Sequence, residues 1–345
     1  MRAIIYSGPG DVSFGEVPTP TPGPGEVLIR VVANTICGTD LRISNGSKTT
    51  GVIAPRVLGH EVAAVVERVG EGVESYAPGD PVGLCPTYSC GSCEQCRLGR
   101  AHLCESALVL GHQTDGGLAE FVLIPAHAVS SGVLVKHSGT RSAQSICLAE
   151  PLSCIIHGQD FLDIGVGDTV LVIGGGAIGL MHAQVAKISG AELVIVSEPN
   201  PFRRELARDF GADITVDPAA EGLAEIVAAH TSGKGADVTI VCIGVPALVN
   251  DALTLTRNRG RVSLFAGFPA TETAAIDANL IHYRELGVFG SSNSTVDDYR
   301  RAVSLIESGR INCDPLVTHT FPLEQYDTAV DLISAPDALK IAIVP

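Results

Sequence analysis

The segment Thr169-Val-Leu-Val-Ile-Gly-Gly-Gly-Ala-Ile-Gly179 joins a short apolar run to a set of spaced glycines. Gly174, Gly176 and Gly179 fit the pattern G-x-G-x-x-G, and a helix-forming stretch follows them. After a strand, the first glycine allows a tight turn, the second lets a pyrophosphate approach the backbone, and the third lets the helix pack against the strand. The segment, with Ile178 inside it, therefore predicts a strand–turn–helix unit that binds the pyrophosphate of a dinucleotide.

An acidic residue at the end of the next expected strand bears on the choice of dinucleotide. Glu198 follows Gly179 by 19 residues, where a carboxylate can bind both hydroxyls of a ribose and repel a 2′-phosphate. This spacing favours NAD over NADP. A solvated acid at a strand end is the alternative interpretation of Glu198, and the adjacent Arg203 and Arg204 leave NADP open.

Residues 151–290 alternate apolar runs with helical stretches, which is the pattern of a parallel sheet. One helix has clear boundary residues, because Asn200 is a good N-cap, Pro201 suits the first helical position and Gly211 follows the last turn. The predicted strands are 169–173, 193–196, 238–241 and 261–265. We expect an α/β domain here, a Rossmann-type doubly wound parallel sheet.

Residues 1–150 differ in composition and are rich in Pro, Gly and Val. Short apolar runs such as Val27-Leu-Ile29 are separated by turn signals such as Pro78-Gly-Asp80, which favours a mostly β, barrel-like domain. A last helix is expected at about 296–308. We expect residues 291–345 to return to the first domain.

The composition excludes several classes of protein. With 345 residues the chain is long enough for two to three domains, so a disulfide-stabilised mini-protein is excluded. Its 23 Lys and Arg against 38 Asp and Glu give a net charge of −15, so no nucleic-acid or membrane partner is expected. The first apolar run is too short for a signal peptide, and glycines interrupt the uncharged stretch 169–186. We expect a cytoplasmic protein without a membrane span.

Four of the ten cysteines form one tight group in a polar segment. Four thiolates at this spacing suit a closed tetrahedral structural zinc, whose binding would order a lobe with little core of its own. An iron–sulfur cluster is the alternative, but the bacterial pattern places its fourth cysteine three residues after the third and before a proline. Zinc is therefore favoured over a cluster or disulfides. The four, in the order C-x2-C-x2-C-x7-C, are Cys90, Cys93, Cys96 and Cys104.

A second constellation combines different ligand types from separate segments. Cys37, His60 with Glu61, and Glu150 offer a thiolate, an imidazole and carboxylates, the mixture found in an open catalytic zinc site. Each signal is weak alone, because a single cysteine is more often a buried apolar thiol and a single histidine is more often structural. The combination is what predicts a catalytic metal.

Taken together, these motifs resemble the zinc-dependent medium-chain dehydrogenases, especially their sorbitol (polyol) dehydrogenase-like branch. The resemblance implies a GroES-like fold for the first domain, two Zn²⁺ per subunit, NAD as cofactor and a homodimer or homotetramer. The matching segments run almost end to end and are Gly59-His-Glu61, Val69-Gly-Glu-Gly-Val73, Pro78-Gly-Asp80, the four-cysteine group, Asp115-Gly-Gly-Leu-Ala-Glu120 and Ala149-Glu-Pro-Leu152.

The same resemblance assigns roles to individual residues. Cys37, His60 and Glu61 look like ligands of the catalytic zinc, and Glu150 like a fourth ligand or the carboxylate that exchanges with water. Thr39 falls on the hydroxyl that receives the alcohol proton, and Arg203 on a position along the adenine.

The resemblance further implies oxidation of a secondary alcohol of a polyol to the ketose. Sugar-alcohol phosphate, aldonate, 2,3-butanediol and L-threonine dehydrogenases of the same family are the alternatives. Many relatives carry a histidine three residues after the relay hydroxyl, where this chain has Arg42, and this departure disfavours threonine. We hypothesise that Arg42, with Lys48, binds an anionic or heavily hydroxylated end of the substrate. A solvated surface arginine is the alternative.

Two other classes of protein share part of this pattern. A zinc-ribbon-like binding module would explain the four-cysteine group, but it needs neither the second constellation nor the glycine turn. A metal-free quinone or enoyl reductase of the same superfamily would normally lack both cysteine-containing sets. Metal analysis separates that class from a zinc enzyme.

Overall fold

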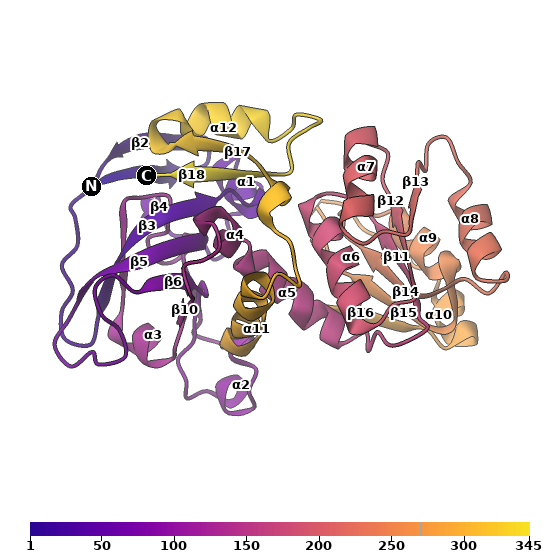
Figure 1. Cartoon of the computed structure of the whole chain (residues 1–345), viewed down its shortest axis with the longest axis horizontal. Coiled ribbons are helices and arrows are strands. Elements are labelled where there is room, and N and C mark those ends of the chain that lie inside the picture. Colours follow the sequence, from indigo (N-terminus) through magenta and orange to yellow (C-terminus); the bar gives the residue numbers. More distant parts are fainter. Residues whose placement is uncertain (270) are drawn as a thin grey trace. The chain divides into compact units, whose positions relative to one another are not determined.

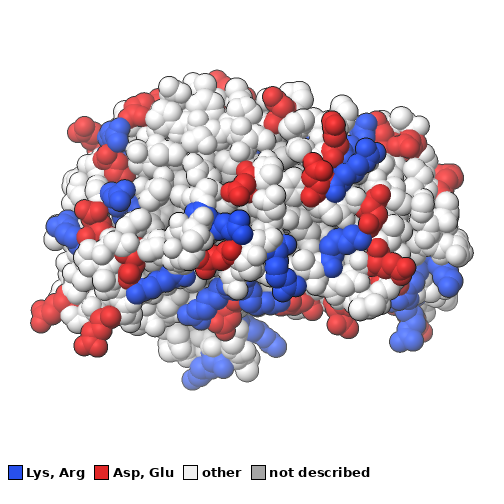
Figure 2. All heavy atoms as spheres, viewed as in Figure 1, with Lys and Arg blue, Asp and Glu red and all other residues white. Residues whose placement is uncertain are grey.

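The computed structural model of the chain describes residues 1–269 and 271–345. The chain divides into two compact units (Figure 1). Unit 1 comprises Met1–Ser153 and Asn293–Pro345, and unit 2 comprises Cys154–Ser292. Within the described part of the chain, none of the helices has the length and apolar character needed to cross a bilayer. Acidic and basic side chains are interspersed on the face drawn in Figure 2.

Unit 2 contains one parallel sheet with the strand order β13-β12-β11-β14-β15-β16. This is a doubly wound arrangement, in which the strand order reverses beside β11, so the expected Rossmann-type sheet is confirmed. The strands are β11 (Thr169–Ile173), β12 (Leu193–Ser197), β13 (Ile214–Val216), β14 (Ala236–Val241), β15 (Thr256–Leu264) and β16 (Gly287–Gly290). The helices are α6 (Ala177–Ser189), α7 (Pro201–Asp209), α8 (Leu223–His230), α9 (Leu248–Leu255) and α10 (Ala278–Arg284).

Burial explains why the central strands read as continuous apolar runs. In β11, residues 170–173 are all buried, because helices cover both faces of a parallel sheet. Leu171, Ile195 and Val262 belong to one apolar cluster with residues of neighbouring elements. β15 begins earlier than expected, at Thr256, because its polar first half still pairs with β14 through Ala236. Side-chain pattern alone does not mark such a polar extension as a strand.

The boundaries of α7 follow the expected chemistry. The Asn200 side chain accepts a hydrogen bond from the backbone N–H of Arg203 at 3.2 Å, and Pro201 opens the helix. Gly211 follows the last turn with φ +93°, which favours glycine. The sequence prediction for this helix is confirmed.

Unit 1 is built around a curved sheet with the path β10-β6-β5-β3-β18-β17, on which β9 also pairs with β3. A smaller sheet has the order β2-β1-β4. These strands form the mostly β domain that the sequence predicts. The strands are β1 (Arg2–Gly8), β2 (Asp11–Glu16), β3 (Val27–Thr35), β4 (Arg56–Val57), β5 (Glu61–Val69), β6 (Pro81–Leu84), β9 (Phe121–Ile124), β10 (Leu134–Lys136), β17 (Val317–Pro322) and β18 (Lys340–Val344).

The C-terminal segment completes unit 1. β18 pairs antiparallel with β3, and β17 pairs parallel with β18 (yellow beside indigo in Figure 1). Helix α11 (Val296–Glu307) starts at Thr295, whose side chain accepts from the N–H of Asp298 at 3.1 Å. The last strand therefore lies directly beside the strand that leads into Cys37.

The four-cysteine segment forms a separate lobe of unit 1. Short strands β7 (Thr87–Tyr88) and β8 (Leu108–Val109) pair at its base, and α2 (Glu94–Arg97) and η1 (Ala101–Leu103) form its body. Each of residues 90–103 is exposed or half-buried. The lobe has no apolar interior to hold these short elements together.

Candidate active site and metal centres

Neighbouring strands bring the second constellation together. β3 and β5 are antiparallel, and Thr35 pairs with Glu61, so Cys37 and His60 leave the same edge of the sheet. One ligand atom from each of Cys37, His60 and Glu61 lies within 4.8 Å of the others. A thiolate, an imidazole and a carboxylate at this separation can bind one metal ion and leave a tetrahedral position open.

Cys37 is fixed by the start of helix α1 (Gly38–Ser44), which it caps. Its Sγ accepts from the backbone N–H of Thr39 at 3.4 Å, and its own N–H donates to Asp40 Oδ2 at 2.9 Å. These reciprocal bonds form a capping box built on a cysteine rather than on Ser or Thr. The sulfur is therefore held in place without a metal.

Asp40 also orients the histidine of the cluster. Its Oδ1 lies 3.3 Å from His60 Nδ1, and both side chains are buried. Burial opposes the imidazolium, but the charges of Asp40 and Cys37 outweigh it, so the pKa of His60 is raised well above its usual range. A carboxylate behind a ligating histidine fixes which ring nitrogen faces the metal. Asp40 was missed in the sequence, although its place three residues after Cys37 is a capping signal.

Glu61 has a buried cationic partner from the far end of the chain. Lys340 Nζ donates to both carboxylate oxygens of Glu61, at 2.6 Å for Oε2, and the Thr35 hydroxyl donates to the same carboxylate. Burial opposes the ammonium, but the charges of Glu61 and Cys37 raise the pKa of Lys340 above its usual value. Nothing in the local sequence around Lys340 indicates this contact.

Thr39, the expected proton relay, bonds to the cluster through its backbone N–H. Its Oγ1 accepts a hydrogen bond from Arg42 Nη2 at 3.0 Å, so Arg42 lies next to this hydroxyl. His112, which the sequence did not single out, meets the His60 ring edge-on with centroids 5.6 Å apart. Burial lowers the pKa of His112 to about 4, so it is neutral at pH 7.

Glu150 stands apart from the three ligand candidates. It lies in helix α5 (Ala149–Asp160) and, among the described residues, falls outside the group whose ligand atoms meet within 4.8 Å. Its charge nevertheless acts on Lys340, where it is one of the causes of the raised pKa. The structure thus brings together Cys37, His60 and Glu61, and Glu150 is not part of this group.

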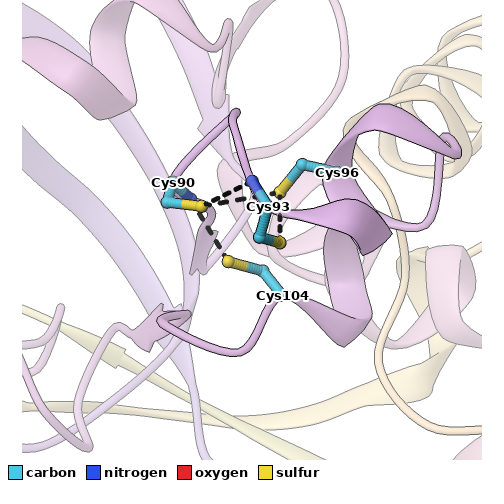
Figure 3. A group of neighbouring side chains, drawn as sticks. All are labelled: Cys90, Cys93, Cys96 and Cys104. Carbon is cyan, nitrogen blue, oxygen red and sulfur yellow. Dashed lines mark hydrogen bonds between the residues drawn. The ribbon is translucent and has the colours of Figure 1, made fainter.

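The four cysteines of the lobe converge in the way the spacing predicts. Figure 3 shows their thiols turned toward one another. Cys93 Sγ lies 3.5 Å from Cys96 Sγ, and Cys90 Sγ lies 4.0 Å from Cys96 Sγ. The backbone N–H of Cys90 donates to Cys104 Sγ at 3.3 Å. Hydrogen bonds from Ser92 and Cys93 lower the pKa of Cys90 to about 6, which favours the thiolate that a metal needs.

The glycine turn of unit 2 leaves room where a ligand is expected. Gly174 has φ +103°, and a Cβ on Gly179 would lie 1.8 Å from the Gly174 carbonyl oxygen. A Cβ on Gly176 would meet no protein atom within 4 Å, so the backbone there is open to an incoming group. Ile178 is half-buried in the first turn of α6. The fold requires the first and third glycines, whereas no protein contact requires glycine at 176.

Glu198 lies beside this turn. Its Oε2 accepts from the N–H of Gly175 at 2.7 Å and its Oε1 from the N–H of Asn200 at 2.8 Å. Glu198 and Arg203 line a cavity of about 560 Å³ with Ile173, Ile243 and Leu223. A polar edge and apolar walls suit a nucleoside.

Known proteins are similar in sequence to this chain over its whole length. A model of the alcohol dehydrogenase GroES-like domain matches residues 23–133, and one of the zinc-binding dehydrogenases matches residues 177–308. The L-threonine 3-dehydrogenase of Pyrococcus horikoshii is 36% identical, covering 100% of this chain and 98% of its own. The sorbitol dehydrogenase of Halalkalibacterium halodurans is 33% identical over 100% of this chain and 99% of its own.

A solved structure agrees with the sequence relatives. A zinc-binding dehydrogenase of Sinorhizobium meliloti 1021, bound to NADP, superposes with a TM-score of 0.92 at 35% identity and covers 100% of this chain and 99% of its own. The fold and the length of this chain agree with these relatives. This chain belongs to the zinc-dependent medium-chain dehydrogenases.

Proposed function

We propose that this chain oxidises a secondary alcohol of a polyol to the ketone, with NAD⁺ as the hydride acceptor. The observation that carries the proposal is the meeting of Cys37, His60 and Glu61 within 4.8 Å, next to Thr39, whose backbone N–H bonds to Cys37 Sγ. The reaction balances as alcohol plus NAD⁺ giving ketone, NADH and a proton.

The protein side chains divide the work around the metal. Cys37, His60 and Glu61 would hold the catalytic Zn²⁺, with Glu150 as a fourth ligand or as the carboxylate that exchanges with water. Cys90, Cys93, Cys96 and Cys104 would hold the structural Zn²⁺. When bound, the catalytic zinc supplies Lewis acidity that lowers the pKa of an alcohol, and NAD⁺ accepts the hydride. Asp40 keeps His60 oriented, since its carboxylate faces Nδ1.

Thr39 relays the proton of the alcohol in this proposal: Oγ1 accepts that proton while the hydroxyl's own proton leaves to solvent water. Its Oγ1 already accepts from Arg42, and a guanidinium can only donate, so one lone pair of Thr39 is occupied by that bond. The second lone pair remains for the alcohol proton. Arg42 thus sets the direction in which the Thr39 hydroxyl points.

The groups around Glu198 support NAD⁺ rather than NADP⁺. Each Glu198 oxygen accepts one backbone bond and keeps a lone pair for a ribose hydroxyl. Arg204 is committed elsewhere, because it donates to the carbonyl oxygen of Glu198 at 2.8 Å and pairs with Asp217 at 3.1 Å. Arg203 remains on the cavity wall, along the expected adenine. The Sinorhizobium relative was solved with NADP bound, so rates with NAD⁺ and with NADP⁺ should be compared for this chain.

L-Threonine is the second candidate substrate, because the P. horikoshii relative carries that activity in its name and matches over its whole length. Arg42 argues against it, since a guanidinium beside the relay would repel the ammonium of threonine.

We further propose a homodimer or homotetramer, which light scattering on the purified protein would test.

Initial rates of NADH formation by the zinc-loaded protein test the reaction class. The panel comprises hexitols, pentitols, 2,3-butanediol, aldonates, polyol phosphates and L-threonine, with NADP⁺ in parallel. We expect turnover of a polyol-type alcohol with NAD⁺ and at least 10-fold lower kcat/KM with NADP⁺. Cys37→Ser should lose the catalytic zinc and the activity while keeping NADH binding. Turnover of threonine alone would overturn the polyol assignment.

A further inference from the structure

We propose that Arg42 and Lys48 form an anion-binding subsite beside the catalytic cluster, and that the substrate is a polyol derivative carrying a carboxylate or phosphate. The inference rests on the proposed function, whose substrate class it narrows. It is drawn from the position of two cations, of which Lys48 has no part in the proposed reaction.

The end of helix α1 brings the two cations together. The backbone N–H of Lys48 donates to the carbonyl oxygen of Arg42 at 2.8 Å, which folds the chain back on itself. Ser47 and Gly46 make this reversal, since the Ser47 N–H donates to Asn45 Oδ1 at 2.9 Å and Gly46 has φ +79°. Residues six apart in the sequence therefore lie side by side.

Both cations lie within reach of the cluster. Arg42 donates to Thr39 Oγ1 at 3.0 Å, and the Thr39 N–H donates to Cys37 Sγ at 3.4 Å, so two hydrogen bonds link Arg42 to the metal-binding sulfur. The pKa of Lys48 is lowered by half-burial and by the charge of Arg42, while Cys37 acts in the opposite direction.

The charges around the pair are otherwise compensated. Asp40 faces His60, and Glu61 is bonded to Lys340. Within residues 1–269 and 271–345, neither Arg42 nor Lys48 has a carboxylate at ion-pair distance. Two like charges held together without a counter-ion are unfavourable, in a chain whose net charge is −15. An anionic group between them would relieve that repulsion and accept charge-assisted hydrogen bonds from both.

This arrangement discriminates among the alcohols that the family could oxidise. A neutral polyol leaves the repulsion in place. L-Threonine brings a carboxylate but also an ammonium two bonds away, which the same cations repel. An aldonate or polyol phosphate supplies only negative charge, and its carbon chain can reach back to Thr39 with a secondary hydroxyl.

A matched substrate set tests the subsite. D-Sorbitol, D-gluconate and sorbitol 6-phosphate share a six-carbon backbone and differ in terminal charge. For the zinc-loaded protein with saturating NAD⁺, we expect kcat/KM for gluconate or sorbitol 6-phosphate to exceed that for sorbitol by ~10- to 100-fold, the range for charged hydrogen bonds. The advantage should shrink as NaCl is raised, because the pair is partly exposed.

Two variants and one control locate the effect. Lys48→Gln should raise KM for the anionic substrate by ~10-fold and change kcat/KM for sorbitol far less, since sorbitol has no charged group for Lys48 to bind. Arg42→Gln should raise KM similarly and also lower kcat, because it frees the Thr39 hydroxyl. Arg68→Gln removes an exposed arginine of β5 and should change neither value. Isothermal titration with inorganic phosphate gives a readout independent of turnover, and Lys48→Gln should weaken that binding ~10-fold.

The outcomes separate this inference from the proposed function. If sorbitol is oxidised as well as the anionic substrates and Lys48→Gln changes nothing, the subsite is wrong and the dehydrogenase stands. If the variants raise KM for NAD⁺ alone, the two cations serve the cofactor phosphates, and the substrate assignment is overturned. If no alcohol reduces NAD⁺, the proposed function fails. In that case, phosphate binding that depends on Lys48 would still support the anion-binding subsite. A lack of phosphate binding would overturn the subsite together with the proposed function.

Discussion

At the scale of single residues, Glu61 is held by a partner that sequence proximity does not supply. Lys340 is only 7% exposed and Glu61 is fully buried, so each charge depends on the other for compensation. Removing one partner of such a pair leaves a buried charge unpaired, which costs about 3–5 kcal/mol. The pair therefore fixes the position of the Glu61 side chain at the edge where β18 meets β3.

Lys340→Met tests this dependence. We expect the free energy of unfolding of the zinc-free protein to fall by about 3–5 kcal/mol, because Glu61 is left buried without its cation. Denaturant titration followed by circular dichroism gives the value. Lys136→Met is the matched control, since Lys136 pairs with Asp80 at 2.7 Å while 48% exposed, and such pairs contribute about 1 kcal/mol or less. Adding Glu61→Gln to Lys340→Met should recover much of the loss. Equal stabilities of the two lysine variants would contradict this account.

At the scale of elements, the four-cysteine lobe depends on its ligands because its helices are too short to be stable alone. α2 has four residues and η1 has three, far below the length at which an isolated helix persists. Leu98 and Leu103 are 56% and 50% exposed, so they contribute little apolar burial. If the four cysteines hold zinc as proposed, its binding would be the main source of order for residues 90–104.

Cys93→Ser should lower the zinc content from two ions per chain to one and unfold the lobe locally. Mass spectrometry of the native protein gives the stoichiometry, and limited proteolysis should show cleavage between residues 90 and 104. Cys85→Ala is the control, because Cys85 is buried outside the lobe and burial raises the pKa of its thiol to about 12. Two retained zinc ions in Cys93→Ser would show that the four thiols do not act as one site.

The elements also show what the sequence could and could not predict. The unit from Thr169 to Gly179 and the helix after Asn200 were predictable, because strand, turn and cap signals are local. The short strands β13 and β16 were not marked, since a few residues carry too little periodicity. The partnership of Lys340 with Glu61 depends on a β-pairing between positions some three hundred residues apart, which no local pattern encodes. His112 was likewise missed, because a lone histidine carries no signal of its neighbours.

At the scale of the whole molecule, the two units carry different parts of the chemistry. The candidate metal ligands all lie in unit 1, and the glycine turn and Glu198 lie in unit 2. Each unit has its own sheet and apolar interior, so each can respond separately to what it binds. A ligand that binds only the folded state stabilises by RT ln(1 + [L]/Kd), about 2.7 kcal/mol at 100 times Kd.

Hydrogen exchange should therefore report the two units differently. At 100 times Kd, NADH should slow exchange by up to ~100-fold in β11 and α6, which surround the glycine turn, and by less in β3 and β5 of unit 1. Removal of zinc should accelerate exchange in residues 90–104 and leave β11 unchanged. NADPH is the matched ligand, and its smaller protection at equal concentration would measure how strongly Glu198 rejects a 2′-phosphate. Uniform slowing of both units by NADH would mean that they unfold as one cooperative body. That result would contradict the prediction that NADH protects unit 2 more than unit 1.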